Sequence, residues 1–308
     1  YLPEHTLAAK ALAHAMGADY IEQDVVLTRD AVPIVLHDIY LDSTTDVAAK
    51  FPDRQRQDGH YYAMDFTLEE VRRLAVHERV AAKGDNRKAV YPQRFPPQHA
   101  LFSVPTLAEE IDLISGLDES RGRSTGLYIE LKSPNRHRQA GLDSPGAVLQ
   151  VLREKGYDKR PDSVILQCFD DATLKQLRDT LESPLPLVQL IGDNSWGEDS
   201  AVDYDFLRTE EGLDYIAGYA NGIGPWLAHV YLGRDGDGKA RLHPLLQQAR
   251  ARGLLVHPYT FRRDELPRGV DSFDELLDIV LQAPSVDGIF TDCPDLAVQY
   301  LARRAQGK

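Results

Sequence analysis

Residues 18–38 read Ala-Asp-Tyr-Ile-Glu-Gln-Asp-Val-Val-Leu-Thr-Arg-Asp-Ala-Val-Pro-Ile-Val-Leu-His-Asp, and the chain is organised around them. Two apolar, β-branched runs, 20–28 and 33–38, flank a short polar break, which predicts a hairpin of two strands. A turn centred on Asp30-Ala31 would place Asp24 opposite His37 on the neighbouring strand.

The predicted hairpin gathers acidic and imidazole side chains into one patch. Glu22 and Asp24 lie two positions apart, so they point to the same face of their strand. Carboxylates this close repel each other unless a cation joins them, and hard divalent cations take oxygen ligands. The sequence therefore indicates a metal site here. The alternative is a half-exposed hairpin on which Glu22, Asp24 and His37 are solvated.

The length and the charge of the chain limit the classes of protein to which it can belong. The chain has 308 residues, 43% of them hydrophobic, which suits one α/β barrel with insertions or two smaller domains. Its formal net charge of −13 disfavours nucleic acid and anionic membranes as general partners. No apolar run has transmembrane length. Both cysteines, Cys168 and Cys293, lie in strand-like runs and are expected to be buried thiols.

The order of the predicted elements points to a barrel. A helix over 6–16 and the hairpin come first, followed by a polar segment at about 40–104 that we interpret as a long insertion able to cover a site. A capping box, Thr67-x-x-Glu70, predicts a helix within the insertion, and a second one, Thr106-x-x-Glu109, predicts a helix through about residue 115. A Gly/Asp loop is expected at 233–238. Predicted strands at 126–132, 163–169, 187–191, 221–225, 254–260 and 288–291 then alternate with predicted helices at 144–155, 171–182, 210–219, 243–252, 272–282 and 295–304. This alternation favours a single TIM (β/α)₈ barrel domain over residues 1–308. A doubly wound open sheet is the alternative, and no Gly-rich dinucleotide fingerprint supports it.

Polar side chains stand where the predicted strands end, which is the catalytic face of a barrel. Glu130 and Lys132 share one face of their strand, and Glu130 is the natural third oxygen ligand beside Glu22 and Asp24. Lys132 would balance the acidic charge and hold an anion such as phosphate. His37 would then act as a general acid or base, although such a scheme wants a second proton carrier.

A set of motifs spread over nearly the whole chain resembles the glycerophosphodiester phosphodiesterases, and the insertion resembles that of the bacterial periplasmic type. The motifs, in order, are Pro3-Glu-His-Thr6, Glu22-Gln-Asp24, Leu36-His-Asp38, Glu130-Leu-Lys132, Leu166-Gln-Cys-Phe169, His257-Pro-Tyr-Thr260 and Phe290-Thr-Asp-Cys-Pro294. The set is specific, whereas any single motif is not.

The resemblance implies a TIM barrel with an accessory hairpin strand, and hydrolysis of glycerophosphodiesters to an alcohol and sn-glycerol 3-phosphate. It implies a divalent metal, usually calcium in the periplasmic type and magnesium in many relatives, and a periplasmic or secreted location. The implied site residues are Glu22, Asp24 and Glu130 for the metal, His37, Glu4 and Lys132 for catalysis, and Lys132, Gln167 and Tyr259 for substrate binding. Taken alone, Gln167 is more typical of a structural residue.

One departure from the family pattern concerns the beginning of the chain. The family has a first barrel strand ending in His-Arg-Gly before the motif at Pro3, and the sequence starts at Tyr1. We therefore expect residues 1–308 alone to lack the first strand and to turn over poorly. Three alternatives stay open: a phosphodiesterase acting on teichoic-acid glycerophosphate polymers, one acting on lysophospholipids, and a non-catalytic glycerophosphate-binding barrel. The oligomeric state is not indicated.

Overall fold

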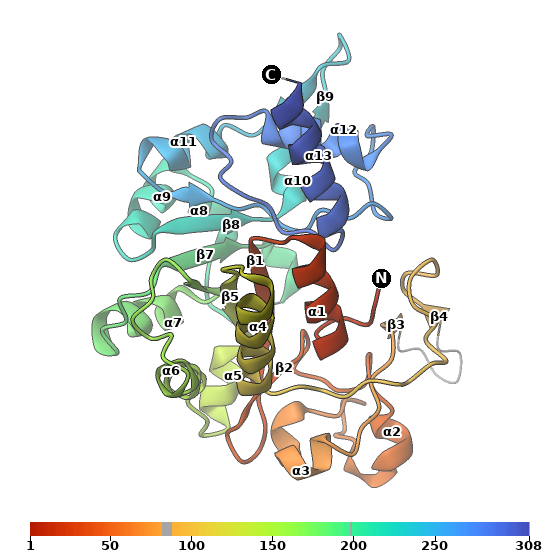
Figure 1. Cartoon of the computed structure of the whole chain (residues 1–308). Coiled ribbons are helices and arrows are strands. Elements are labelled where there is room, and N and C mark those ends of the chain that lie inside the picture. The colour runs from red at the N-terminus through yellow and green to blue at the C-terminus, as the bar shows by residue number, and fades with distance from the viewer. Residues whose placement is uncertain (82–87, 198, 308) are drawn as a thin grey trace. The chain divides into compact units, whose positions relative to one another are not determined.

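The structure is a computed structural model that describes residues 1–81, 88–197 and 199–307. Its contacts divide the chain into two compact units (Figure 1). The first comprises Tyr1–Ala15 and Asp19–Val164, and the second comprises Met16–Ala18 and Ile165–Lys308. Each unit alternates strands with helices.

The first unit holds the predicted hairpin, the insertion and the strand that carries Glu130. Its elements are α1 (Leu7–Met16), β1 (Tyr20–Leu27), β2 (Pro33–Val35), α2 (Val47–Lys50), η1 (Pro52–Arg54), η2 (Ala63–Asp65), α3 (Leu68–Val71), β3 (Val80–Ala81), β4 (Lys88–Ala89), α4 (Leu107–Arg121), β5 (Gly126–Leu131), α5 (Pro134–Gln139) and α6 (Ser144–Glu154). Strand β1 lies between β2, which is antiparallel to it, and β5, which is parallel to it.

The hairpin is confirmed, but the predicted register is wrong by one residue. Val25 pairs with Val35, so Asp24 lies level with Leu36, whose amide donates to the Asp24 carbonyl at 2.9 Å. The turn contains three residues rather than two, and Ala31 closes it with a left-handed φ of 60°. His37 therefore lies beyond the end of β2.

Helix α1 is present at the predicted place, and Gly17 follows it with φ +95°, as a helix C-terminus favours. The side chains that α1 buries are Lys10 and His14 rather than apolar residues. Lys10 Nζ lies 3.6 Å from Glu110 and His14 Nε2 lies 2.8 Å from Asp118, both on α4. Polar side chains therefore make contacts between the two helices.

The insertion at 40–104 builds a small core of its own against the hairpin. Its buried apolar side chains include Leu41, Val47 and Phe66, and they pack with Val26 and Ile34 of the hairpin. The predicted capping box at Thr67 is confirmed, although the helix it opens, α3, is a single turn. The capping box at Thr106, where α4 begins, is confirmed as well.

The second unit continues the alternation of strands and helices. Its elements are β6 (Val164–Cys168), α7 (Asp171–Lys175), η3 (Gln176–Thr180), β7 (Leu187–Ile191), η4 (Asn194–Trp196), α8 (Tyr204–Leu207), α9 (Glu210–Ala217), β8 (Gly222–Pro225), α10 (Leu227–Val230), β9 (Tyr231–Arg234), β10 (Ala240–Leu242), α11 (Leu245–Ala251), β11 (Leu255–Val256), α12 (Phe273–Leu281) and α13 (Pro294–Gln306). Strands β6, β7, β8 and β11 are parallel neighbours in that order.

Two predicted strands of the second unit are shorter than expected. The strand predicted over 254–260 is reduced to β11, and the residues predicted as a strand at 288–291 make an isolated bridge, Phe261↔Thr291. Strands β9 and β10 form a hairpin, and most of the predicted Gly/Asp loop, residues 235–238, lies in the turn between them. Both cysteines are free and buried, as predicted.

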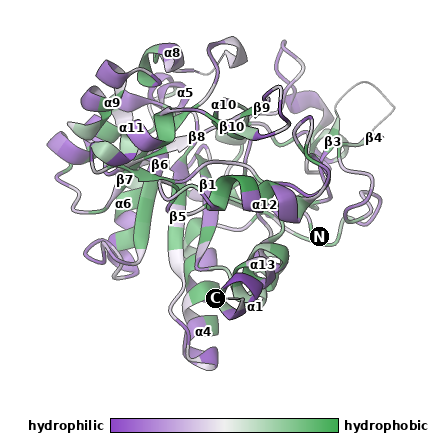
Figure 2. Ribbon diagram, turned by 90° about the horizontal axis from the view of Figure 1, so that it is seen from above, coloured by the Kyte–Doolittle hydropathy of each residue, from purple (hydrophilic) through white to green (hydrophobic). Residues whose placement is uncertain are grey.

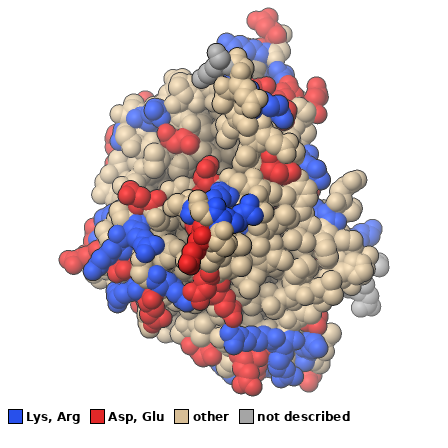
Figure 3. Space-filling view, in the orientation of Figure 1, with Lys and Arg blue, Asp and Glu red and all other residues tan. Residues whose placement is uncertain are grey.

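Burial follows the expected division between strands and helices. All six residues of β5 and all five of β6 and of β7 are buried, as strands covered on both faces require. The helices carry both hydrophobic and hydrophilic residues (Figure 2). On the face shown in Figure 3, Lys and Arg side chains lie beside Asp and Glu side chains. Within the described residues, no helix is both long and apolar enough to cross a membrane.

Candidate active site

The site of the first unit begins on the paired strands β1 and β5. Asp24 is the register partner of Glu130, and Glu22 lies two residues earlier on β1. Asp24 and Glu130 are almost wholly buried. Parallel pairing thus brings the predicted acidic residues from two distant segments side by side, as their common face requires.

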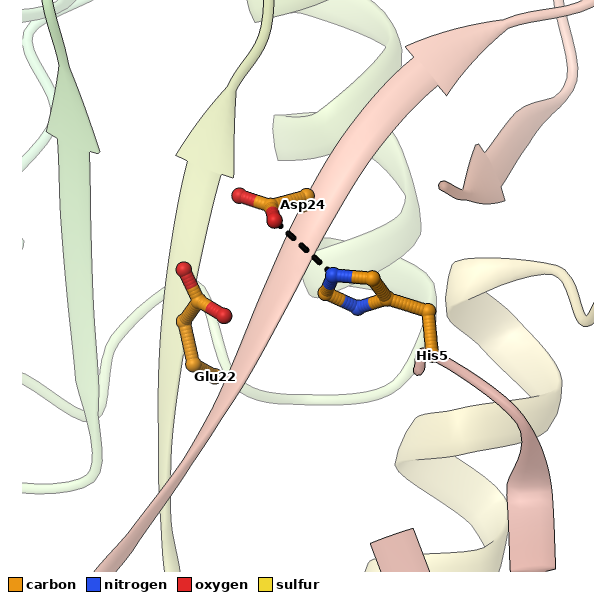
Figure 4. A group of neighbouring side chains, drawn as sticks. All are labelled: His5, Glu22 and Asp24. Carbon is orange, nitrogen blue, oxygen red and sulfur yellow. Dashed lines mark ion pairs between the residues drawn. The ribbon is translucent and has the colours of Figure 1, made fainter. Parts of the chain in front are cut away.

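A third group joins Glu22 and Asp24, and it is His5. One ligand atom from each of the three residues lies within 4.8 Å of the other two. Figure 4 shows the two carboxylates and the imidazole turned toward one another, with His5 Nε2 2.8 Å from Asp24 Oδ2. His5 has a left-handed φ of 55°, a conformation that costs energy in a non-glycine residue. The chain is thus turned sharply where this imidazole meets Asp24.

Both ring nitrogens of His5 are engaged. Lys10 Nζ donates to Nδ1 at 3.1 Å, so the ring proton lies on Nε2 and is donated to Asp24. Burial and the positive charge of Lys10 lower the pKa of His5, against the opposing effect of Asp24. His5 is therefore a neutral imidazole that orients Asp24. Lys10 also donates to the backbone carbonyl of Glu22, which ties α1 to the same strand.

The three carboxyl groups at the centre of the site differ in the direction in which their pKa values are shifted. Burial and the negative charge of Asp24 raise the pKa of Glu22 well above its ordinary value. Burial also raises the pKa of Glu130, to about 8, with Lys132 opposing and Asp24 reinforcing the shift. Burial acts against ionisation of Asp24 too, but Lys132 and His5 outweigh it and lower the pKa of that carboxyl. Glu22 and Glu130 are therefore harder to ionise than ordinary carboxyl groups unless further positive charge is supplied.

Lys132 is the predicted cation of the site and lies among these acids. Its Nζ is 2.9 Å from Glu130 Oε1 and 3.6 Å from Asp24 Oδ1. Burial opposes its charge, but Asp24 and Glu130 raise the pKa of Lys132 above its ordinary value. Lys132 is therefore a permanent positive charge at neutral pH.

His37 stands at the exposed end of a second chain of contacts. Its Nδ1 lies 2.7 Å from Asp38 Oδ1, and its side chain is 51% exposed. Asp38 Oδ2 accepts from Ser43 Oγ at 2.7 Å and from Arg79 Nη1 at 2.6 Å. This arrangement fixes the tautomer of His37 and leaves Nε2 to exchange a proton with a ligand.

Arg79 joins this chain to Glu4. Its guanidinium donates from Nε at 2.9 Å and from Nη2 at 2.5 Å to the two carboxylate oxygens of Glu4. Burial would raise the pKa of Glu4, but Arg79 outweighs it and lowers that pKa to about 2. Glu4, Arg79, Asp38 and His37 therefore form one continuous network.

Two predicted substrate-binding residues lie in the second unit. Gln167 is buried on β6. Tyr259 follows β11, and its hydroxyl donates to the Ile191 carbonyl at 3.1 Å. Their roles stay predictions, as do those of the residues on the first unit.

Sequence reasoning missed three residues that complete the site: His5, Lys10 and Arg79. His5 lay in a motif quoted above, but its neighbours gave no sign that the chain turns it toward Asp24. Lys10 lies in the helix predicted over 6–16, where a lysine is ordinarily expected to face solvent. Arg79 comes from the insertion, where local sequence shows no periodic pattern.

The donor set fits a divalent cation. Glu22, Asp24 and Glu130 carry three negative charges when ionised, and Lys132 supplies one positive charge, whereas Lys10 is paired with Glu110. A divalent ion would bring the sum of these charges to zero. The raised pKa values of Glu22 and Glu130 express the same shortage of positive charge. Carboxylate oxygens, with an imidazole beside them, suit calcium or magnesium.

The chain resembles known proteins along most of its length. The family model described as the glycerophosphoryl diester phosphodiesterase family matches residues 1–296. A glycerophosphodiester phosphodiesterase of Haemophilus influenzae is 39% identical over 98% of this chain and 86% of its own length. One of Treponema pallidum is 36% identical over 99% of this chain and 90% of its own length.

Solved structures show the same fold. A protein of Silicibacter pomeroyi assigned to the glycerophosphoryl diester phosphodiesterases is 26% identical, with a TM-score of 0.70 over 98% of this chain and 90% of its own. A phosphodiesterase of Oleispira antarctica, solved with the product sn-glycerol-3-phosphate, is 20% identical, with a TM-score of 0.62 over 98% of this chain and 92% of its own. These likenesses confirm the predicted TIM-barrel class.

Proposed function

The chain belongs to the glycerophosphoryl diester phosphodiesterase family, and on that premise we propose that it hydrolyses small glycerophosphodiesters to an alcohol and sn-glycerol 3-phosphate with the help of a divalent cation. The observation that carries the proposal is the gathering of Glu22, Asp24 and His5 within 4.8 Å, with Lys132 beside Asp24 and Glu130. The relative solved with sn-glycerol-3-phosphate supports the product assignment.

We propose that Glu22, Asp24 and Glu130 hold the cation, calcium first and magnesium as the alternative. A bound divalent cation would stabilise the negative charge that develops on the phosphate oxygens. Lys132 binds the same phosphate group by charge, since it stays protonated at neutral pH. His5 and Lys10 keep the Asp24 carboxylate and the β1 backbone in place.

His37 carries the proton in this scheme. In the first step a hydroxyl of the glycerol attacks phosphorus and passes its proton to a second carrier, while Nε2 gives a proton to the oxygen of the departing alcohol as its bond to phosphorus breaks. In the second step water opens the cyclic phosphate, Nε2 takes a proton from that water, and the second carrier returns its proton to the glycerol oxygen, so no net proton stays on the protein. Asp38 holds the ring through Nδ1 and favours the imidazolium that forms. Glu4 acts one step further away, because it orients Arg79, which in turn orients Asp38.

The test is the release of sn-glycerol 3-phosphate from glycerophosphocholine, with calcium and then magnesium supplied. Glu22→Ala should abolish both metal binding and turnover, whereas His37→Ala should abolish turnover and leave metal bound. His99→Ala is the matched control, because His99 is an exposed histidine of the insertion.

Two results would contradict the assignment. Near-normal turnover by His37→Ala would remove His37 from the proton transfer. Metal binding by the protein with no turnover of any glycerophosphodiester would favour the non-catalytic binding reading. A preference for glycerophosphate polymers or lysophospholipids over glycerophosphocholine would redirect the substrate assignment to those alternatives.

A further inference from the structure

The chain leaves strand β5 abruptly just after Lys132. The Lys132 amide still donates to the Val25 carbonyl of β1 at 3.1 Å, as in regular parallel pairing. The next residue, Ser133, has a left-handed φ of 42°, and helix α5 begins at Pro134. A non-glycine residue rarely adopts this conformation, so the surrounding contacts must hold it. The turn at Ser133 therefore decides where the Lys132 backbone stands at the end of the two strands.

A side chain replaces the backbone acceptor that β1 would meet at this point. The amide of Thr28 donates to Val32 of the hairpin at 3.1 Å, so the amide of the preceding residue, Leu27, points to the other edge, toward β5. In a regular parallel ladder a carbonyl of β5 would accept from Leu27. Here Leu27 donates instead to Nε2 of His137, on α5, at 2.9 Å. The imidazole of His137 thus continues the hydrogen bonding where the two strands part.

The second ring nitrogen of His137 holds the turn itself. Nδ1 lies 3.0 Å from the carbonyl oxygen of Ser133, which can only accept a hydrogen bond. The ring proton is therefore on Nδ1, and the unprotonated Nε2 accepts from Leu27. The imidazole in this way joins the last residue of β1 to the left-handed residue that follows Lys132.

His137 is wholly buried and neutral in this position. Burial lowers the pKa of His137, although hydrogen bonding to the backbone of Ser133 and Lys132 opposes the shift. A protonated ring would also turn an N–H group toward the Leu27 amide, which is itself a donor. Because the ring is buried and bonded through both nitrogens, an effect of His137 on the reaction has to pass through its neighbours.

The neighbour that matters for chemistry is Lys132. Its Nζ lies 2.9 Å from Glu130 and 3.6 Å from Asp24, and this position depends on where the backbone leaves the strand. The bond to Val25 fixes the Lys132 backbone on one side, and the turn held by His137 fixes it on the other. A displacement of about 1 Å at a group that binds the reacting atoms can lower a rate by about 100-fold.

We propose that His137 is a positioning residue of the reaction: by bonding Leu27 and Ser133 it ends β5 after Lys132 and holds the phosphate-binding ammonium beside Asp24 and Glu130. The inference rests on the proposed function, because it concerns how Lys132 binds the phosphate of that substrate. A purely structural residue would change the amount of folded enzyme, and with it kcat, and would leave KM unchanged. Loss of a positioning residue weakens the grip on phosphate and raises KM.

Two substitutions separate the bonds of the two ring nitrogens. In His137→Asn the amide can still donate to Ser133 but is too short to reach Leu27, whereas in His137→Gln the longer side chain can accept from Leu27. His137→Asn should raise KM for glycerophosphocholine at least about tenfold, and His137→Gln should hold it within about threefold. The dissociation constant of sn-glycerol 3-phosphate, measured by calorimetry with calcium supplied, should rise by the same factors.

His14→Asn is the matched control. His14 is an equally buried histidine of the first unit, and it contacts Asp118 of α4 rather than the residues around Lys132. This change should lower the free energy of unfolding and leave KM unchanged. The bond itself is followed by hydrogen exchange at the Leu27 amide, which should be protected in the wild type and in His137→Gln and should exchange at least about tenfold faster in His137→Asn.

Three results would overturn the proposal. An unchanged KM in His137→Asn, with faster exchange at Leu27, would assign His137 to stability alone. Nitrogen NMR spectra that place the ring proton of His137 on Nε2 would remove the bond from Leu27. If His137→Asn does not fold, a tenfold rise of KM in His137→Gln would contradict the role given to that bond. Failure of the proposed function is distinguishable, because the wild type itself would then release no sn-glycerol 3-phosphate, while the binding and exchange comparisons would still decide the role of His137.

Discussion

Replacing Glu110 by glutamine is expected to remove a pH dependence from the stability of the protein. Glu110 is fully buried on α4, and neither of its carboxyl oxygens accepts a hydrogen bond from the described residues. Burial raises the pKa of Glu110 from 4.5 to about 7, although Lys10 at 3.6 Å opposes the shift. The folded protein therefore holds a proton on Glu110 that the unfolded chain releases.

The sign and the size follow from proton linkage. Between about pH 4.5 and 7 the folded state binds one more proton than the unfolded state, so the free energy of unfolding falls as pH rises. At about 1.4 kcal/mol for each pH unit, the loss across this window is about 3 kcal/mol. The stabilisation is complete below about pH 4.5 and is lost as pH rises through about 7.

The assay is urea unfolding of the wild type and Glu110→Gln at pH values from 4 to 8. The variant should lose about 3 kcal/mol less than the wild type across this range, because its amide cannot titrate. Asp112→Asn is the matched control, since Asp112 lies on the same helix as Glu110 and makes an exposed ion pair with Lys155. Parallel curves for the wild type and Glu110→Gln would refute the assignment of a buried protonated carboxyl.

Two other substitutions test how the site is supported. Arg79→Met leaves Glu4 and Asp38 without their shared cation, so it should lower the free energy of unfolding by on the order of 3 kcal/mol and lower turnover as well. The control Arg72→Met breaks an exposed ion pair and should lower the free energy of unfolding by less than about 1 kcal/mol. Equal losses of the two variants in urea unfolding would contradict this prediction. Thr106→Ala removes the cap of α4 and should cost about 1 kcal/mol in the same assay, a loss that Thr106→Ser should largely avoid.

The sequence predicted those structural features that depend on residues close together in the chain. The capping boxes at Thr67 and Thr106 are present because each needs only a hydroxyl and a glutamate three residues later. The strands predicted at 126–132 and 187–191 follow from short, mainly apolar runs, and both segments are buried in the structure.

Features that depend on distant contacts were missed or misread. The hairpin register failed because Ala31 adopts a left-handed conformation that its residue type does not announce. The buried face of α1 is polar because Glu110 and Asp118 of α4 lie opposite Lys10 and His14. No window of sequence contains both members of such a pair.

The sequence predicted the acidic residues of the site, but it did not predict the residues that hold them in place. Alternation along a strand places Glu22 and Asp24 on one face, and parallel pairing adds Glu130. His5 and Arg79 reach the site through a tight backbone turn and through the insertion, which pattern reasoning does not describe. The pairing of His5 with Asp24 and of Arg79 with Asp38 is seen only in the folded structure.

The central claim, that acidic oxygens of β1 and β5 hold one divalent cation, is tested most directly by calorimetric titration of calcium into the wild type, Glu22→Gln and the control Glu69→Gln, which alters an exposed acid on α3. We expect calcium to bind the wild type and the control with equal affinity, and to bind Glu22→Gln at least about tenfold more weakly. Unchanged calcium affinity in Glu22→Gln would contradict the account.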